Sequence, residues 1–219
     1  MRKHSFVVIG LGTFGSTVAS ELAAFGNHVI GIDSEEGPVS RLADTLTEVL
    51  IADARDEEAL REAGVANCDA AVIAIGEDLE ANILCTMNAK LLGVPCIWVK
   101  ARTRTHHRIL SRLGADRVIE PEQEIGQHVA QKLHNPLIRD YLSLGNGFYI
   151  IDIRLPERLD GANLEALGIH GDSAIRCLGV MRNTDYLAGD APGIRLAADD
   201  KLLLLGRRQA LREFSEKLL

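Results

Sequence analysis

Three glycines near the start of the chain, Gly10, Gly12 and Gly15, stand between a short apolar run and an amphipathic segment. This G-x-G-x-x-G spacing is typical of the first turn of a dinucleotide-binding βαβ unit. The first glycine permits the tight turn, the second lets the backbone approach a pyrophosphate, and the third lets the helix pack against the strand. The N–H groups at the helix N-terminus attract phosphate. The whole loop, which also contains Leu11, Thr13 and Phe14, is therefore predicted to bind an adenine nucleotide.

An acid follows the second predicted strand, as a dinucleotide site requires. Asp33 lies 18 residues after Gly15 and precedes Ser34. A carboxylate at this position accepts hydrogen bonds from ribose hydroxyls and disfavours a 2′-phosphate, so NAD is favoured over NADP. The alternative is that Asp33 caps the helix that comes next.

A second acid ends the third predicted strand. Asp53, followed by Ala54, is expected beside the adenine. The alternative is that Asp53 is the N-cap of a helix over Asp56–Ala63, because Asp is a favoured N-cap residue.

Two further strand ends complete the predicted cleft. Ile75 and Gly76 follow the fourth strand, where the strand order of such a sheet reverses and ligands bind. Lys100 and Ala101 follow the fifth strand, and Lys100 is placed to reach a phosphate or a ribose. The alternative for Lys100 is a solvated lysine at a strand end.

Short apolar runs alternate with helical patterns through the first part of the chain, and 47% of all residues are hydrophobic. This alternation predicts an α/β, Rossmann-like, doubly wound parallel sheet, assigned to a first domain over residues 1–134. Glycines just after helical stretches are expected to be left-handed C-terminal caps. The expected strands are Phe6–Ile9, Val29–Ile32, Glu48–Ile51, Ala70–Ile75, Cys96–Val99 and Arg117–Ile119, and the clearest helices are Ser16–Phe25, Glu57–Ala63, Leu79–Leu92 and Thr105–Leu113.

The pattern changes after residue 134, and a small α+β domain is predicted over residues 135–219. A domain of this size has little core of its own, so we expect it to dimerise or to pack on another subunit. Pro136 is expected to start a short helix. The expected elements are a helix over Leu137–Leu144, strands over Phe148–Leu155, Ala174–Arg182, Asp185–Leu187 and Lys201–Leu205, and a last helix over Gln209–Leu218.

Charge and motifs exclude several classes of protein. The net charge is −7 without a Lys/Arg-rich block, which argues against nucleic acid as a partner. No apolar run approaches the roughly 20 residues of a membrane span. The sequence contains no GxxxxGK[ST] loop, which argues against a P-loop hydrolase, and no GxSxG elbow, which argues against a serine hydrolase of that type. No two cysteines form a CxxC pair, so free thiols in a reducing cytosol are expected. His106 and His107 have no evident carboxylate partner and are interpreted as solvated or packing residues.

Several segments resemble the cytosolic regulatory subunits of bacterial potassium transport systems, the KtrA/TrkA proteins built from RCK domains. The likeness covers nearly the whole chain, is most specific in the first half, and favours the Ktr branch because of the chain length. The C-terminal part looks like the family's RCK_C lobe. The segments that carry the resemblance are FVVIGLGTFG over Phe6–Gly15, Ala74 to Gly76, IWVKA over Ile97–Ala101, His106 with His107, and GADRVIEPE over Gly114–Glu122.

The resemblance implies a cytoplasmic gating subunit without catalytic activity, peripheral to the membrane. Such subunits form an octameric homo-oligomeric ring beneath an integral membrane potassium-translocating subunit, and ATP and ADP compete for the Rossmann site. If the ring has two conformations, each nucleotide can change their populations only by as much as its affinities for the two differ. By resemblance, Glu122 helps to hold a cation near the nucleotide of a neighbouring subunit, and Glu120 shares that role. The alternative for Glu122 is an acid that favours a helix dipole after Pro121.

Two departures from the family pattern bear on the choice of nucleotide. Thr13 stands where ATP-sensing Ktr members carry Arg, so a charge-assisted phosphate contact is missing. Asp53 stands where Ktr relatives often have Asn, which adds a negative charge near the base or ribose. NAD(H) and AMP therefore stay open beside ATP and ADP.

Some relatives bind cyclic di-AMP in the C-terminal lobe. The comparable stretch here is Ile169–Cys177, in which His170 and Arg176 are candidates to hold a phosphate. The alternative is an ordinary strand edge with a polar loop.

Two other functions remain open from the sequence. An NAD-dependent oxidoreductase would use the same first domain, but it needs an acid–base pair and a substrate pocket that the C-terminal part does not evidently supply. A redox or nucleotide sensor that acts on a soluble partner is the third alternative.

Overall fold

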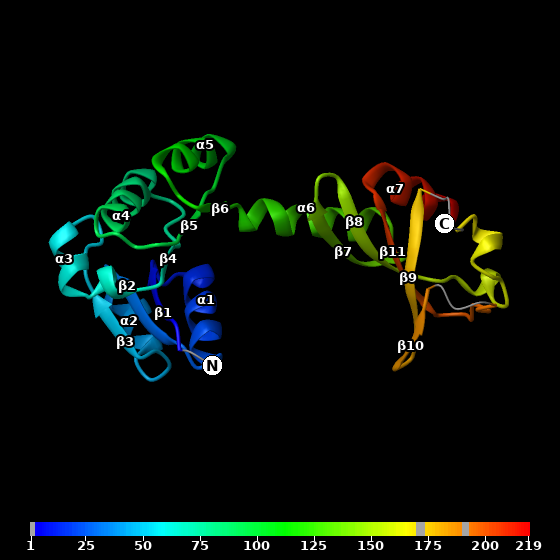
Figure 1. Ribbon diagram of the computed structural model, residues 1–219, viewed down its shortest axis with the longest axis horizontal. Coiled ribbons are helices and arrows are strands. Elements are labelled where there is room, and N and C mark those ends of the chain that lie inside the picture. The colour runs from blue at the N-terminus through cyan, green and yellow to red at the C-terminus, as the bar shows by residue number, and fades with distance from the viewer. Residues whose placement is uncertain (1–2, 170–173, 190–192) are drawn as a thin grey trace. The chain divides into compact units, whose positions relative to one another are not determined.

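A computed structural model of the chain describes residues 3–169, 174–189 and 193–219 (Figure 1). It divides into two units, Met1–Gln123 and Glu124–Leu219. The division falls within helix α6 (Pro121–His134), so the domain boundary after residue 134 stays a prediction. None of the helices in the described part of the chain combines the length and apolarity that crossing a membrane needs.

The first unit is built on a six-stranded sheet of order β3-β2-β1-β4-β5-β6, and every pairing is parallel. The last three residues of strand β1, Val7 to Ile9, are buried on both faces of the sheet, which explains the apolar run that begins at Phe6. The order reverses between β1 and β4, as the predicted doubly wound fold requires. The strands are β1 (Ser5–Ile9), β2 (His28–Asp33), β3 (Glu48–Ile51), β4 (Ala70–Ile73), β5 (Ile97–Lys100) and β6 (Arg117–Ile119).

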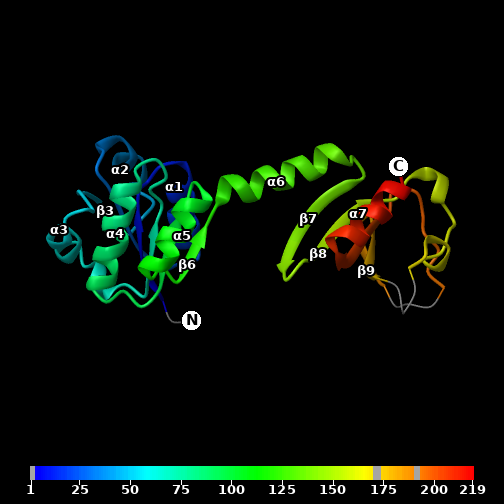
Figure 2. The same ribbon diagram turned by 90° about the horizontal axis from the view of Figure 1, so that it is seen from above.

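Helices cover both faces of this sheet, as Figures 1 and 2 show from two directions. Apolar residues of α1 and α2 pack on one face, and those of α3, α4 and α5 pack on the other. The left-handed caps predicted at four glycines are confirmed, since Gly26, Gly64, Gly93 and Gly114 all have positive φ. A helix after Asp33 was considered only in the alternative role of that residue as a cap, and no bounds were predicted for α2. The helices are α1 (Thr13–Ala24), α2 (Glu36–Leu42), α3 (Glu57–Glu62), α4 (Leu79–Leu91) and α5 (Arg104–Leu113).

The second unit is a five-stranded antiparallel sheet of order β10-β9-β11-β8-β7 with one helix, α7 (Arg208–Lys217), packed on it. Its core joins alternate residues of β8 and β11 to Leu211 and Phe214 of α7. This period of two is what a half-buried strand requires. The strands are β7 (Ile138–Gly145), β8 (Phe148–Arg154), β9 (Ile175–Arg182), β10 (Asp185–Ala188) and β11 (Lys201–Arg207).

The helix predicted over Leu137–Leu144 is wrong, because this segment is strand β7. It pairs antiparallel with β8 through a turn in which Gly145, Asn146 and Gly147 all have positive φ. Tyr141 of β7 stacks on Tyr149 of β8 with ring centroids 4.6 Å apart. The hairpin therefore determines the conformation of β7 through cross-strand contacts, which outweigh the weak helical pattern.

Candidate nucleotide-binding site

A cleft of about 490 Å³ lies at the C-terminal ends of the central strands of the first unit. This is within the volume range of small-molecule sites, roughly 300–1,000 Å³. The structure brings together much of the predicted site in its lining: Gly10, Gly12, Asp33, Ser34, Asp53, Ala54, Ile75 and Gly76.

The three glycines of the loop meet different steric demands. Gly10 has φ +88°, and a Cβ there would lie 3.2 Å from the Ala74 carbonyl carbon. A Cβ on Gly15 would lie 1.8 Å from the carbonyl oxygen of Gly10, so the start of α1 packs directly on the turn. A Cβ on Gly12 would meet nothing within 4 Å, and Gly12 lines the cleft. Gly12 thus leaves open the place where a phosphate would approach the first turn of α1.

Asp33 connects the end of β2 to the glycine loop. Its Oδ2 accepts a hydrogen bond from the Leu11 backbone N–H at 2.6 Å, and its Oδ1 accepts one from the Glu35 N–H at 3.0 Å. The N-cap of α2 is Glu35, so Asp33 is not the cap of that helix. The carboxylate lines the cleft while it holds the loop in place.

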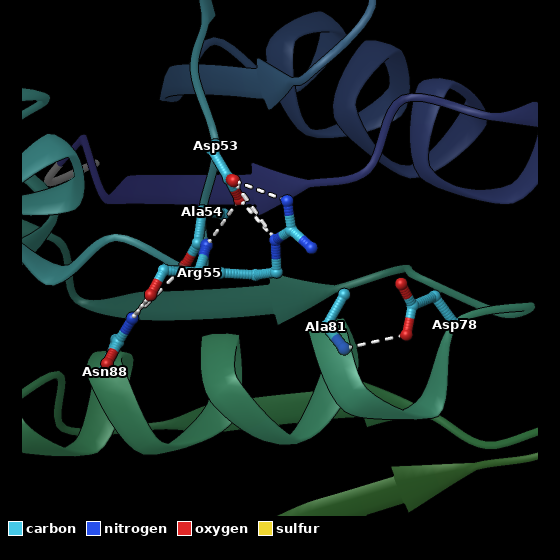
Figure 3. Close-up of polar contacts among 6 residues, drawn as sticks. All are labelled: Asp53, Ala54, Arg55, Asp78, Ala81 and Asn88. Atoms are coloured by element: carbon cyan, nitrogen blue, oxygen red, sulfur yellow. Dashed lines mark hydrogen bonds and ion pairs between the residues drawn. The ribbon is translucent and has the colours of Figure 1, made fainter.

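Asp53 forms an ion pair with Arg55 inside the cleft (Figure 3). Arg55 Nη2 donates to Asp53 Oδ2 at 2.7 Å, and Arg55 Nε lies 2.9 Å from Oδ1. The arginine contacts hold the pKa of Asp53 below its ordinary value. The N-cap of α3 is Asp56, whose side chain accepts from the Glu58 N–H, so the N-cap alternative for Asp53 is wrong.

Arg55 is a site residue that sequence reasoning missed. Asn88 of α4 fixes its loop, because Asn88 Nδ2 donates to the carbonyl oxygens of Ala54 at 3.3 Å and Arg55 at 2.8 Å (Figure 3). Its position two residues after a strand-end aspartate was the available signal. The rest of the charged lining is acidic, and consists of Asp33, Glu35, Asp53, Glu77 and Asp78.

Asn82 of α4 is a second residue that the sequence did not single out. Its buried Nδ2 donates to the carbonyl oxygens of Ile75 at 2.6 Å and Lys100 at 2.9 Å. One amide therefore holds the ends of β4 and β5 together at the floor of the cleft.

Cys85 is the only sulfur among the residues that line this cleft. Burial raises the pKa of its thiol to about 12, so the thiol stays protonated near neutral pH. A nucleophilic or redox role requires the thiolate. All four cysteines of the chain are free, as the sequence predicted.

Lys100 lies beside the cleft and is not among its lining residues. Its Nζ is 2.5 Å from Glu122 Oε1 and 5.8 Å from the ring centroid of Phe14. A Cβ on Gly76 would lie 3.2 Å from the same Nζ, so the ammonium borders the crevice. Hydrogen bonding from Lys100 lowers the pKa of Glu122.

Other predicted residues contribute no side chain to the lining. Leu11 and Ala101 are buried in the core, while Thr13, Phe14 and Gly15 belong to α1, whose N-cap Gly12 has no side-chain cap. The first turn of α1 therefore keeps N–H groups free of a capping side chain.

His107 has a carboxylate partner, contrary to the sequence interpretation. Its Nδ1 lies 2.8 Å from Glu120 Oε1. Within residues 3–169, 174–189 and 193–219, no group of three or more His, Cys, Asp or Glu side chains is placed to hold a metal ion. A cation at Glu122 would therefore need ligands from outside this set.

The stretch suggested for cyclic di-AMP falls partly outside the described residues, because these exclude His170 and its neighbours up to residue 173. Of the remainder, Ile169 and Cys177 are buried, and Arg176 is exposed on β9.

Comparisons with known proteins agree with this fold. The TrkA-N domain family matches residues 6–121. Ktr system potassium uptake protein A of Bacillus subtilis (strain 168) is 30% identical over 217 residues, which are 99% of this chain and 98% of the relative. The protein of the same name from Vibrio alginolyticus is 32% identical over 206 residues and covers 94% of each chain.

A solved structure described as the GsuK channel bound to NAD is similar to this chain with a TM-score of 0.66. The two sequences are 15% identical, and the superposition covers 99% of this chain and 39% of the GsuK chain. At this identity the similarity shows the fold alone. The family match and the full-length similarity agree with each other. The chain therefore belongs to the TrkA-N domain family and, within it, to the Ktr system potassium uptake proteins.

Proposed function

We propose that this chain is a nucleotide-sensing regulatory subunit of a potassium transport system. The observation that carries the proposal is the cleft at the glycine loop, in which Gly12 leaves open space and the carboxylate of Asp33, the proposed ribose ligand, lines the wall. The full-length similarity to Ktr potassium uptake proteins supplies the biological context.

The ligand we propose is an adenine nucleotide, either ATP or ADP or the dinucleotide NAD(H). Acids at the ends of β2 and β3 disfavour a 2′-phosphate. Thr13 supplies no charge to a terminal phosphate, so Lys100 and a cation held by Glu122 and the nucleotide are the proposed counter-charges. The GsuK structure described as bound to NAD belongs to a protein of the same fold and makes NAD a ligand to test.

We further propose that the chain assembles as a homo-oligomeric ring on an integral membrane potassium-translocating subunit, at the cytoplasmic side. Helix α6 supports assembly, because none of its residues is buried and its apolar residues share one face. Ile125, Val129 and Leu133 recur at a spacing of four and are 63%, 47% and 80% exposed. Such a stripe is typical of a surface that a partner covers.

We propose no catalytic step for the cleft. Its thiol is protonated, Asp33 and Asp78 accept hydrogen bonds from backbone N–H groups, and Asp53 pairs with Arg55. A nucleotide instead acts by binding one state of the assembly more tightly than another, which shifts the equilibrium toward the state that it prefers.

The test is a thermal-shift panel with ATP, ADP, AMP, NAD and NADH, each with and without Mg²⁺. A ligand that binds the folded chain raises its melting temperature by mass action. We expect a shift with at least one adenine nucleotide, and its loss in Gly12→Ala, where the added methyl group occupies the phosphate position. No shift with any of these nucleotides would overturn the proposal.

Two further measurements separate the alternatives. Light scattering tests assembly, and a strictly monomeric chain would contradict the ring. Turnover of NADH with simple carbonyl substrates would instead support an oxidoreductase.

A further inference from the structure

A second cavity, of about 360 Å³, lies within the second unit and is separate from the nucleotide cleft. It is formed by the last turn of α6, the strands β7 and β8, and one face of α7. Its lining combines an apolar wall with polar and cationic groups: Ala130, Gln131, His134, Asn135, Ile138, Tyr141, Ile151, Arg208, Leu211, Arg212 and Ser215.

Asn135 carries an unused hydrogen-bond donor in this cavity. The residue is 1% exposed, and its Oδ1 accepts from the Leu137 N–H at 3.0 Å in the turn that starts β7. Its Nδ2 has no partner among the described residues. Because a buried N–H without a partner costs roughly 1–3 kcal/mol, such a group indicates a ligand or an ordered water.

Arg208 adds a cation that forms no ion pair with any acid in the described part of the chain. It begins α7 and lines the cavity, and its charge acts on the hydroxyl of Tyr141. Arg212, one turn later on the same face, already donates to Glu216 at 2.8 Å. The uncompensated charge at the cavity is therefore positive and comes from Arg208.

Tyr141 provides a further donor. Burial, and then the neighbouring Tyr149, raise the pKa of Tyr141 to about 12, so its hydroxyl keeps its proton at neutral pH. The cavity is also lined by Ile138, Ile151 and Leu211, which are all buried and apolar. A ligand that satisfies both kinds of lining carries an anionic oxygen group on a small apolar body.

We propose that this cavity binds a small organic oxyanion. Asn135 Nδ2 donates to an oxygen of the ligand, Arg208 neutralises its charge, and the apolar wall packs against its hydrocarbon part. The site is independent of the nucleotide cleft, since all its lining residues lie between Ala130 and Ser215.

The test is isothermal titration calorimetry of the full chain with two probes, benzoate and phenyl phosphate, which distinguish a carboxylate from a phosphate ligand. We expect at least one probe to bind. Arg208→Gln should weaken that binding about tenfold or more, because a charge-assisted hydrogen bond is worth roughly 1.5–3 kcal/mol. Arg207→Gln is the matched control, since Arg207 lies over the ring of Phe148 and does not line the cavity.

Asn135→Asp tests the deep donor without removing the turn. Aspartate keeps an oxygen for the Leu137 N–H but replaces the Nδ2 donor with an acceptor, so binding should disappear while circular dichroism stays unchanged. Gly12→Ala should leave the binding intact, because it alters only the other cleft. The proposal is overturned if neither probe binds, or if binding survives Arg208→Gln and Asn135→Asp together.

Discussion

Asp33 Oδ2 accepts a hydrogen bond from the Leu11 backbone N–H at 2.6 Å, and this contact ties the end of β2 to the loop that follows β1. The glycine loop is thus held in place by the residue expected to bind the ribose. A binding surface that is already ordered costs less conformational entropy when the ligand arrives.

Substituting Asp33 should therefore lower both the stability of the glycine loop and the affinity for the nucleotide. Asp33→Ala removes the acceptor for Leu11 and is expected to weaken nucleotide binding tenfold or more, since hydrogen bonds to charged groups are worth roughly 1.5–3 kcal/mol. Asp33→Asn keeps one oxygen for Leu11 and should lose less thermal stability than the alanine variant. Titration calorimetry with ADP and NAD, together with melting temperatures, checks both. Equal affinities for wild type and Asp33→Ala would contradict the ribose role.

Gly12 and Gly15 form a matched pair in which the same substitution should give opposite results. Gly15→Ala places a methyl group 1.8 Å from the Gly10 carbonyl oxygen, so the turn must shift, and we expect a loss of about 3 kcal/mol in the free energy of unfolding. Gly12→Ala meets no protein atom within 4 Å, so the chain should keep its stability and lose nucleotide binding. Urea unfolding and calorimetry separate the two effects.

Arg55 should contribute more to the affinity for phosphorylated ligands than to the affinity for adenosine. Arg55→Ala leaves Asp53 uncompensated in a cleft that already carries several acids, so the affinity for ADP is expected to fall about threefold to tenfold through charge repulsion. Arg61→Ala is the control, because Arg61 pairs with Glu57 and Glu58 on α3 outside the cleft. If both variants weaken ADP binding equally, a local role of Arg55 is contradicted.

If Glu122 holds a cation as proposed, the effect of Mg²⁺ on nucleotide binding should depend on this residue. Its lowered pKa keeps it charged at neutral pH, where it pairs with Lys100. Glu122→Gln is expected to remove the extra thermal shift that Mg²⁺ adds to ATP. Glu124→Gln, an exposed acid two residues further along the same helix, should preserve it. A Mg²⁺ effect that persists in Glu122→Gln would exclude this cation site.

Asp200 should make the second unit sensitive to acid. Burial by itself raises the pKa of Asp200, but hydrogen bonds from Arg182 and the Ala197 N–H outweigh it and hold the pKa below 3.8. Because the folded-state pKa is lowered, the stabilisation is complete above the unfolded value and is lost as pH falls through the folded value.

Asp200→Asn should therefore cost about 2 kcal/mol in the free energy of unfolding at pH 7, and the difference from wild type should shrink below about pH 4. Urea unfolding between pH 3 and pH 7 measures this difference. Asp199→Asn is the control: its pair with Arg154 is exposed, so the expected cost is within about 0.5 kcal/mol. A difference that stays constant with pH would show that the charge of Asp200 is not what stabilises the unit.

Much of the first unit was predictable because its signals are local. The G-x-G-x-x-G turn, the buried strand β1 and the strand-end Asp33 all follow from residue spacing within one βαβ unit. Right-handed crossovers then restrict the possible strand orders to a few.

The features that were missed depend on residues far apart in the chain. Strand β7 is defined by its partner β8, and Glu120 reaches His107 only when β6 is added to the sheet edge next to β5. Asn82 contacts carbonyl groups at the ends of two different strands. Such contacts have no signature in residue spacing, because they exist only after the sheet has formed.

The side-chain amide of Asn82 links the ends of β4 and β5, so that neither end can move alone without breaking a hydrogen bond. Ile75 borders the crevice, and Lys100 carries the ammonium that pairs with Glu122 of α6, the helix that leads out of the first unit. Displacing one strand end without the other breaks a buried hydrogen bond, at a cost of roughly 1–3 kcal/mol. A displacement of the cleft floor at Ile75 therefore has a continuous route of polar contacts to the start of α6, through Asn82 and then through the pair of Lys100 with Glu122.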